Sequence, residues 1–222
     1  MSRHFEEELN ELKSRLLYMG GLVESMIQLA IKALVDRNEV LTHEVFVKED
    51  EVNKIQIEID EKCLQLIALH QPTAVDLRFI TSAIKINSDL ERMGDQAINM
   101  AETGLDLLKH PPLKPLIDLP RMADIVKGMV NNSLDAFVRK DVELAQTVLE
   151  RDDEVDAFKD SIFRELLTLM IADQKNVTRS LDLILIARNL ERIGDHATNV
   201  AEDVIFMVLG KDVRHHVGDV RH

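Results

Sequence analysis

The chain contains two copies of one sequence block. LERMGDQAINMAE occupies residues 90–102, LERIGDHATNVAE occupies residues 190–202, and nine of the thirteen positions are identical. Upstream, residues 26–53 align without gaps on residues 129–156, at an offset of 103 instead of 100. Because both blocks keep their order, we interpret the chain as a duplicated unit with one loop three residues shorter in the second copy. Any fold it adopts should have two similar halves.

The pattern within each half is helical. Apolar residues recur at intervals of three and four almost everywhere, and alternating β-branched runs are missing. Four of the five prolines lie in residues 111–120, where fixed φ angles and missing amide hydrogens exclude a continuing helix. We therefore expect an all-α protein of two tandem three-helix bundles, related by internal duplication and pseudo-twofold symmetry. The expected parts are a first bundle at 1–110, a Pro-rich linker at 111–120, a second bundle at 121–210 and a polar C-terminal tail at 211–222.

Breakers and capping signals predict six helices, at about 4–37, 39–70, 74–109, 119–138, 142–172 and 177–209. Thr73 and Asp76 have the spacing of a capping box, in which each side chain satisfies a free amide of the first helical turn. Gly20 lies inside the first predicted helix, so either a bend or the close approach of another helix is expected there. Gly94 and Gly194 recur in the repeated block, and a close approach by a neighbouring helix would explain both.

Composition excludes several classes of function. The 27 basic and 40 acidic residues give a net charge of −13, and no basic run offers a surface for nucleic acid or an anionic bilayer. The single cysteine, Cys63, has apolar neighbours at helical spacing, which predicts a buried side chain. The polar, acidic start does not resemble a secretory signal, and no apolar stretch approaches the roughly 20 residues that cross a bilayer. We expect a soluble, cytoplasmic protein without direct membrane insertion.

The repeated block carries a narrow acidic stripe. On a helical wheel, four residues of the first copy share a face that is separate from the apolar face: Glu91, Asp95, Asn99 and Glu102. The second copy repeats these positions in the same order: Glu191, Asp195, Asn199 and Glu202. Like charges four residues apart destabilise a helix by about 0.2–0.5 kcal/mol, a cost that a bound cation would remove.

The preceding helix of each half brings further oxygen ligands. Glu49 and Asn53 are four residues apart in the first half, as are Asp152 and Asp156 in the second. If this helix packs antiparallel to the striped helix, the acidic groups of both meet across a groove. Oxygen ligands favour Mg²⁺, Ca²⁺, Mn²⁺ or iron, and zinc is kept among the expected ions. The alternative interpretation is that these are solvated surface acids paired with neighbouring arginines.

Signals for an enzyme are weaker. A di-iron carboxylate bundle needs Glu-x-x-His, and glycine stands three residues after both Glu91 and Glu191. His196 faces Gln96 in the repeat alignment, which rules out a duplicated histidine ligand at that position. No glycine-rich phosphate loop or GxSxG motif is present, so no catalytic residue is expected. A metal-dependent hydrolase that uses the same carboxylates, and a metal-free helical adaptor, stay open as alternatives.

The two blocks, spaced about a hundred residues apart in an acidic helical chain, resemble the signature blocks of the PhoU family of phosphate transport system accessory proteins. The resemblance covers nearly the whole chain and implies two three-helix bundles. It also implies a negative regulator of the phosphate-starvation response. Such a regulator is thought to connect the phosphate ABC transporter with a membrane sensor histidine kinase, and to keep the kinase inactive when phosphate is plentiful.

The resemblance also implies metal ligands. The E(D)xxxD motifs of the family hold polynuclear metal clusters in some members. The positions that match these motifs here are Glu91 and Asp95, Glu191 and Asp195, Asp152 and Asp156, and Glu49. Asn53 stands where the pattern has an acid, so we expect the first site to bind metal more weakly or to hold fewer ions. A homodimer formed through apolar helix faces is the expected assembly.

Overall fold

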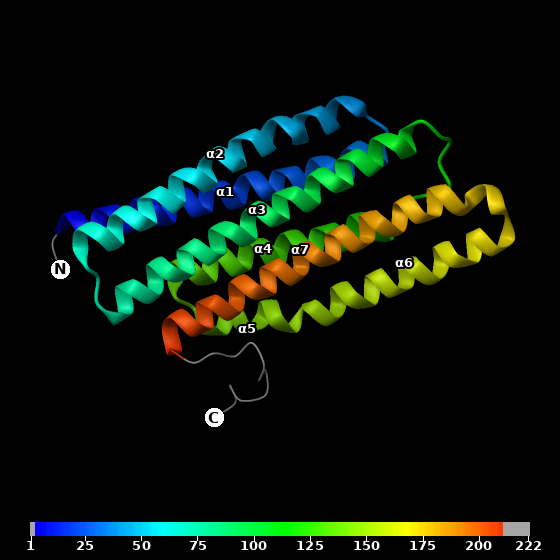
Figure 1. Ribbon diagram of the computed structural model, residues 1–222. Helices are drawn as coiled ribbons and strands as arrows, with labels where there is room; N and C mark the ends of the chain where they lie inside the picture. The colour runs from blue at the N-terminus through cyan, green and yellow to red at the C-terminus, as the bar shows by residue number, and fades with distance from the viewer. Residues whose placement is uncertain (1–2, 211–222) are drawn as a thin grey trace.

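The structure is a computed structural model that describes residues 3–210. Helices lie side by side along one long axis, with α1 to α3 in one half and α4 to α7 in the other (Figure 1). The elements are α1 (Arg3–Asp36), α2 (Glu39–His70), α3 (Ala74–Leu108), α4 (Asp118–Arg139), α5 (Val142–Glu150), α6 (Asp152–Ala172), a 3₁₀ turn η1 (Gln174–Asn176) and α7 (Val177–Leu209). No strand occurs between residues 3 and 210. The predicted all-α class and the two helical bundles are confirmed.

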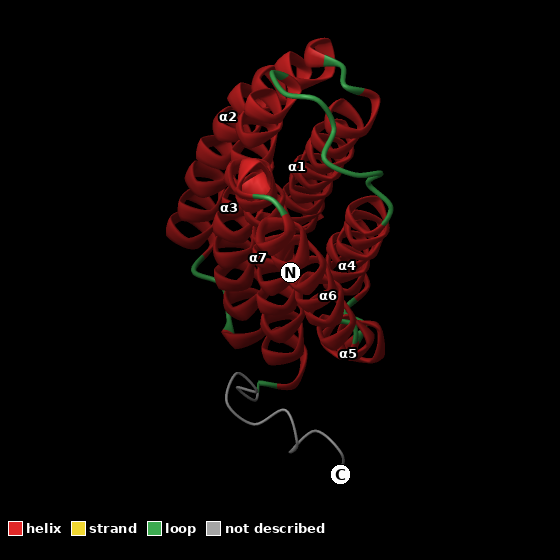
Figure 2. Ribbon diagram, turned by 90° about the vertical axis from the view of Figure 1, so that its right-hand side faces the viewer, coloured by secondary structure: helices red, strands yellow, loops and turns green. Residues whose placement is uncertain are grey.

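The two halves meet along α3 and α7, which lie next to each other at the centre of the molecule (Figures 1 and 2). Arg78 Nε donates to the carbonyl of Met207 at 3.3 Å, and Lys85 Nζ lies 2.7 Å from Asp203 Oδ1. Since residue numbers rise along α3 as they fall along α7, the two helices are antiparallel. The helices that carry the acidic stripes are therefore the ones that join the halves.

Packing around the repeated glycines follows the duplication. A Cβ added at Gly94 would lie 3.6 Å from Val52 and 3.8 Å from Met26. A Cβ added at Gly194 would meet the equivalent side chains of the second half, Val155 and Met129. The expected close neighbours are present, but at ordinary van der Waals distance, so space alone does not demand glycine. At Gly20 the added Cβ would lie 2.1 Å from Leu134 Cδ1, which assigns this glycine to a close approach of α4.

The prediction of one continuous helix at 142–172 is wrong, because this segment forms two helices, α5 and α6. The chain turns at Arg151, whose amide donates to the carbonyl of Val148 at 3.2 Å, and whose carbonyl accepts from Glu154 at 3.1 Å. Three acids, residues 152–154, form the first turn of α6. Negative charge at a helix N-terminus is stabilised by the helix dipole, so the new start suits this sequence. The equivalent helix of the first half, α2, is unbroken.

Two further details differ from the sequence predictions. Thr73 is the N-cap of α3, but its side chain makes no capping hydrogen bond, so the predicted capping box is wrong. The expected linker, 111–120, is helical from Asp118 onward. Pro120 therefore lies in the first turn of α4, where its missing amide hydrogen leaves no helical bond unmade.

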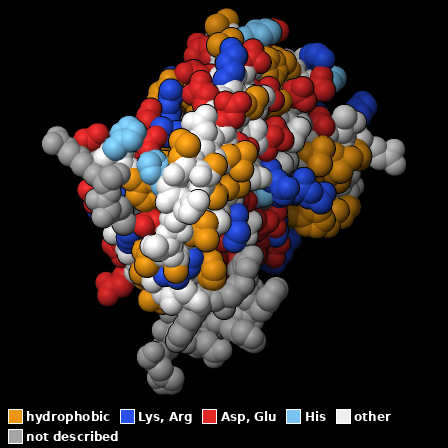
Figure 3. Space-filling view, turned by 60° about the vertical axis from the view of Figure 1, so that its left-hand side comes forward, with side chains coloured by type: hydrophobic (Ala, Val, Ile, Leu, Met, Phe, Trp, Pro, Cys, Tyr) orange, Lys and Arg blue, Asp and Glu red, His pale blue; other side chains and the backbone are white. Residues whose placement is uncertain are grey.

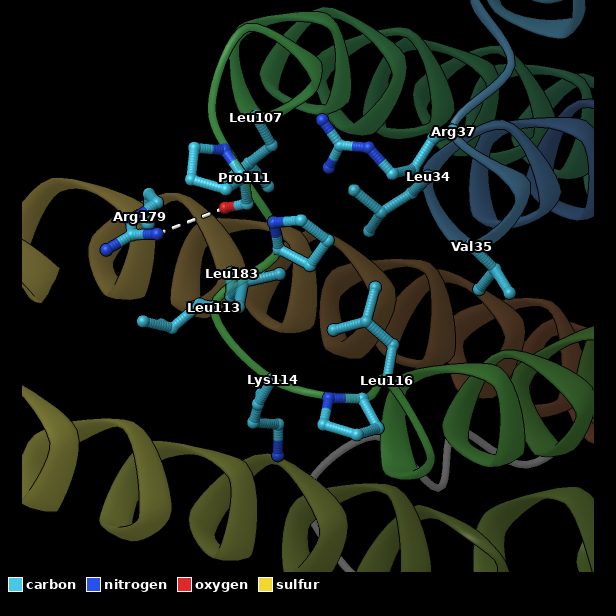
Figure 4. Close-up of a pocket in the computed structure, with 12 residues that line it drawn as sticks. Leu34, Val35, Arg37, Leu107, Pro111, Leu113, Lys114, Leu116, Arg179 and Leu183 are labelled. Carbon is cyan, nitrogen blue, oxygen red and sulfur yellow. Dashed lines mark hydrogen bonds between the residues drawn. The ribbon is translucent and has the colours of Figure 1, made fainter.

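The rest of the linker crosses one end of the molecule between α3 and α4 (Figures 1 and 2). Arg179 donates to the carbonyl of Pro111 at 3.0 Å (Figure 4), and Arg37 donates to that of Leu108 at 2.7 Å. The linker, α1, α3 and α7 line a cavity of about 180 Å³ with mostly apolar walls. Arginines from both halves thus hold the linker in place.

Three further predictions concern the burial of Cys63, the C-terminal tail and the absence of a membrane span. Cys63 is fully buried, as predicted, and burial raises the pKa of its thiol to about 12. The predicted polar tail, 211–222, lies outside the described residues. The sequence analysis expected no membrane-spanning segment. In the described part of the chain, one helix, His4–Asp36, is long and apolar enough to cross a membrane by length and composition alone. In that helix 56% of the most apolar stretch is buried inside the protein, as in a core helix.

Candidate metal-binding faces

The first acidic face consists of Glu49 on α2 and of Glu91, Asp95 and Glu102 on α3. Partial burial raises the pKa of Glu49, and the charges of Asp95, Asp50, Glu102 and Glu91 raise it further. Burial and the charge of Asp95 also raise the pKa of Glu91, against the opposing effect of Arg92 and His196. The structure therefore places these acids close enough to repel one another across the α2–α3 groove.

The second acidic face consists of Asp152 and Asp156 on α6 and of Glu191 and Asp195 on α7. Partial burial raises the pKa of Asp195, with additional contributions from Glu191, Asp152 and Asp156. The pKa of Asp152 is raised by burial and then by Asp156, Asp153 and Glu191. Each half thus gathers four carboxylates on the corresponding pair of helices. Three of the four stand at equivalent positions, and the fourth is Glu102 in the first face and Asp156 in the second.

Lys159 distinguishes the second face from the first. Its ammonium donates to Asp156 Oδ1 at 2.6 Å and to Glu191 Oε1 at 2.9 Å, so it bridges α6 and α7. These two hydrogen bonds raise the pKa of Lys159 above its ordinary value. The equivalent residue of the first half is Gln56. Among the described residues, no basic side chain lies within 4 Å of the four carboxylates of the first face.

The remaining predicted ligands are not clearly grouped with the acids of the two faces. Asn53 is half-buried on α2, Asn99 is exposed on α3, and Glu202 is half-buried on α7. Asn199 lies on the solvent-facing side of α7, and its amide donates to Asp89 Oδ1 in the other half at 3.4 Å. Asn199 is therefore engaged across the α3–α7 contact, away from the acids of its own half.

The candidate ligand atoms of both faces are carboxylate oxygens, and such oxygens suit a hard cation. They are carboxylates that raise one another's pKa, and neutralisation would relieve this repulsion. In the part of the chain described here, no three acidic, histidine or cysteine side chains are gathered tightly enough to hold an ion. Binding at either face therefore requires side-chain rotation toward a shared ion. At the second face it also requires release of Lys159.

The sequence did not predict the contacts of two side chains, Lys159 and His196. Lys159 follows Asp156 by three residues, a spacing that favours an ion pair on a helix, and comparison with Gln56 in the other copy would have marked it. His196 Nδ1 lies 2.8 Å from Asp89 Oδ1, so it joins the two halves. No local signal indicated that pairing, because it depends on how α3 and α7 align.

Figure 3 shows how charged side chains are spread over one face of the molecule. On the face in Figure 3, acidic and basic side chains are interspersed, with apolar groups between them. The sequence as a whole carries a net charge of −13.

Comparison with known proteins identifies the family. The family model for the PhoU domain matches the chain twice, at residues 16–104 and 119–204. The phosphate-specific transport system accessory protein PhoU homolog of Pseudomonas putida is 40% identical over 97% of this chain and 84% of its own length. The homolog from Aquifex aeolicus is 43% identical, over 94% of this chain and 95% of its own length.

Solved structures agree. The crystal structure of PhoU from Pseudomonas aeruginosa superimposes with a TM-score of 0.89 at 40% identity, covering 93% of this chain and all of that one. The phosphate transport system regulatory protein PhoU from Streptococcus pneumoniae gives a TM-score of 0.87 at 28% identity, over 94% of this chain and 99% of that one. Both copies of the repeat, the helical fold and the sequence relatives lead to one assignment. The chain belongs to the PhoU family.

Proposed function

We propose that the protein is a cytoplasmic regulator of phosphate uptake that couples a phosphate ABC transporter to a sensor histidine kinase. In this role it represses the phosphate-starvation response when phosphate is plentiful. The relatives are named as accessory and regulatory proteins of phosphate transport, which supports a role in binding other proteins and not in catalysis. A homodimer is part of the proposal, and sedimentation velocity tests it.

The observation that carries the mechanism is the clustering of four carboxylates on the corresponding pair of helices in each half, three of them at equivalent positions. We propose that these faces hold divalent or iron-type cations. The candidate ligands are Glu49, Glu91, Asp95 and Glu102 in the first face, and Asp152, Asp156, Glu191 and Asp195 in the second, with Glu202 beside it. A bound cation would supply positive charge that offsets their repulsion and ties neighbouring helices together.

The test combines metal analysis with a reporter of phosphate starvation. A variant with alanine at Glu91, Asp95, Glu191 and Asp195 removes the central pair of each face. A matched control places alanine at Glu39, Glu44, Glu143 and Glu150, which are exposed acids outside both faces. Both proteins are purified without tag or chelator, and their metal content is measured by plasma mass spectrometry.

We expect stoichiometric metal in the parent and the control, none in the face variant, and derepression of the reporter at high phosphate in the face variant alone. Circular dichroism checks that the face variant keeps its helical content. Loss of metal with unchanged repression would remove the acidic faces from signalling. Absence of metal from the parent protein would refute the metal proposal itself.

A further inference from the structure

The groove between α6 and α7 differs from its counterpart in the first half. Between α2 and α3, the fully buried Asn87 donates to the carbonyl of Gln56 and to Asp60 Oδ1, both at 2.9 Å. The equivalent residues of the second half are Ala187, Lys159 and Phe163. Because alanine has no amide to reach across, this polar link is missing. A cavity of about 260 Å³ lies there, lined by Phe163, Ile184 and Ala187 and by four charged residues, Lys159, Asp160, Arg188 and Glu191.

Apolar surface extends from this cavity along both helices. Phe163 and Leu167 on α6 are 48% and 42% exposed, and Leu181 on α7 is 49% exposed. Helical spacing puts them on the same stripes as the cavity residues. In the first half, Asp60 and Thr81 replace Phe163 and Leu181. We define the α6–α7 groove by these residues: Phe163, Leu167, Leu181, Ile184, Ala187 and Arg188. Contiguous exposed apolar surface of this kind marks interaction sites.

The rim of the groove carries an arginine that lacks an acidic partner. Arg188 is exposed, and within the described residues no carboxylate lies within 4 Å of its guanidinium. Lys159, at the end of the cavity, is by contrast held by Asp156 and Glu191. The first half has Ser88 in place of Arg188. Asp160, the acid on the α6 side of the cavity, lies 3.9 Å from Arg164. The groove therefore offers an apolar floor and, in Arg188, one cation that is available to a ligand.

We propose that the α6–α7 groove docks a helical segment of a partner protein, one with an aromatic or branched aliphatic residue and an acidic residue one turn away. Two antiparallel helices leave a groove along their axes that accepts a third helix, anchored by apolar residues three or four positions apart. The apolar residue enters the cavity at Ala187. The acidic residue pairs with Arg188, which lies one turn from the cavity residue Ile184. This inference rests on the adaptor role proposed above, because it names where one partner binds, and it requires no metal.

The test uses a phage-displayed library of random peptides of about 16 residues, enough for four helical turns. Peptides selected on the full-length protein are synthesised, and their affinity is measured by fluorescence anisotropy. The double variant A187N/F163D installs the polar pair of the first half, and R188S installs its serine. I57D is the matched control, since Ile57 is an exposed apolar residue of the first half, outside the groove.

We expect selected peptides to contain apolar residues three or four apart and an acid, and to bind about tenfold more weakly to A187N/F163D. R188S should weaken binding about threefold, and added salt should shrink that difference. I57D should bind like the parent. Each variant is checked by its melting temperature before use.

Three results would overturn the inference. The first is that no peptide is enriched, and the second is that enriched peptides bind the parent and A187N/F163D equally. The third is that the parent is a dimer in sedimentation velocity and A187N/F163D is not. The last result would make a second copy of the chain the occupant. None of these measurements involves metal or the starvation reporter, so their failure is distinct from failure of the proposed function.

Discussion

The two acidic faces lie on corresponding helices and share three equivalent acids, but their charges are neutralised differently. Each gathers four carboxylates, and burial and mutual repulsion raise the pKa of acids in both. In the second face Lys159 binds Asp156 and Glu191, whereas the first face has Asn53 and Gln56 at the equivalent places of Asp156 and Lys159. The second face thus has an additional acid, Asp156, together with its counter-charge, Lys159, and the first face has neither of them.

Helix ends add to this contrast. Asp152 lies in the first turn of α6, where the helix dipole favours negative charge, while Glu49 lies inside the continuous α2. The acids of the first face therefore lack both the lysine and the helix-end stabilisation that the second face has. At the four aligned positions that include Asn53 and Asp156, the first half has three acids and the second has four, and this count alone predicts weaker metal binding at the first face. With Lys159 included, we infer the opposite order.

The largest expected effect is stabilisation by metal. Adding Mn²⁺ at a hundred times its dissociation constant should raise the free energy of unfolding by about 2.7 kcal/mol for one site. In a chain of this size that corresponds to a rise in melting temperature of roughly 5–11 °C. Differential scanning fluorimetry of chelated protein, with and without Mn²⁺, measures it. No shift in the parent, or an equal shift in the variant lacking Glu91, Asp95, Glu191 and Asp195, would contradict metal binding at these faces.

Exchanging Lys159 and Gln56 between the two faces should reverse the order of their affinities for Mn²⁺. Lys159→Gln removes two charge-assisted hydrogen bonds at a partly exposed site, so the metal-free protein should lose about 0.5–1 kcal/mol of stability. Its second face should then bind Mn²⁺ more tightly. The converse variant, Gln56→Lys, should weaken binding at the first face. Urea unfolding and calorimetric titration measure the two effects, and unchanged Mn²⁺ affinity in both variants would show that the lysine does not compete with metal.

The smallest effect is a pH dependence of the metal-free protein. Because folding raises the carboxyl pKa values of Glu91 and Asp195, the folded state holds more protons just above the unfolded values near pH 4. Stability from these groups therefore falls as pH rises through that window, and the cost is complete at neutral pH. Neutral isosteres, Glu91→Gln with Asp95→Asn, should stabilise by about 0.2–0.5 kcal/mol at pH 7 and have no effect near pH 4.

The same exchange at the second face, Glu191→Gln with Asp195→Asn, serves as the comparison. It should stabilise less, because it also removes a partner of Lys159. Urea unfolding at both pH values measures the difference. A larger gain at the second face than at the first would break the proposed contrast between them.

Sequence alone predicted the helical class, the duplication and most helix limits, because these follow from apolar periodicity and prolines. It also raised the hypothesis that acids of neighbouring helices meet if those helices pack antiparallel, and the charge of Glu91 does raise the pKa of Glu49. The turn at Arg151 was missed, because no glycine or proline marks it. The Asn87–Asp60 link and the cavity at Ala187 were missed because each depends on which residues face one another between helices.

The most direct test of the contrast is a calorimetric Mn²⁺ titration of two chelated variants. E191A/D195A keeps the first face intact, and E91A/D95A keeps the second. Our account predicts that the protein with the first face intact binds Mn²⁺ about tenfold more tightly, because no lysine has to be displaced there. Equal or tighter binding by the protein with only the second face intact would contradict it.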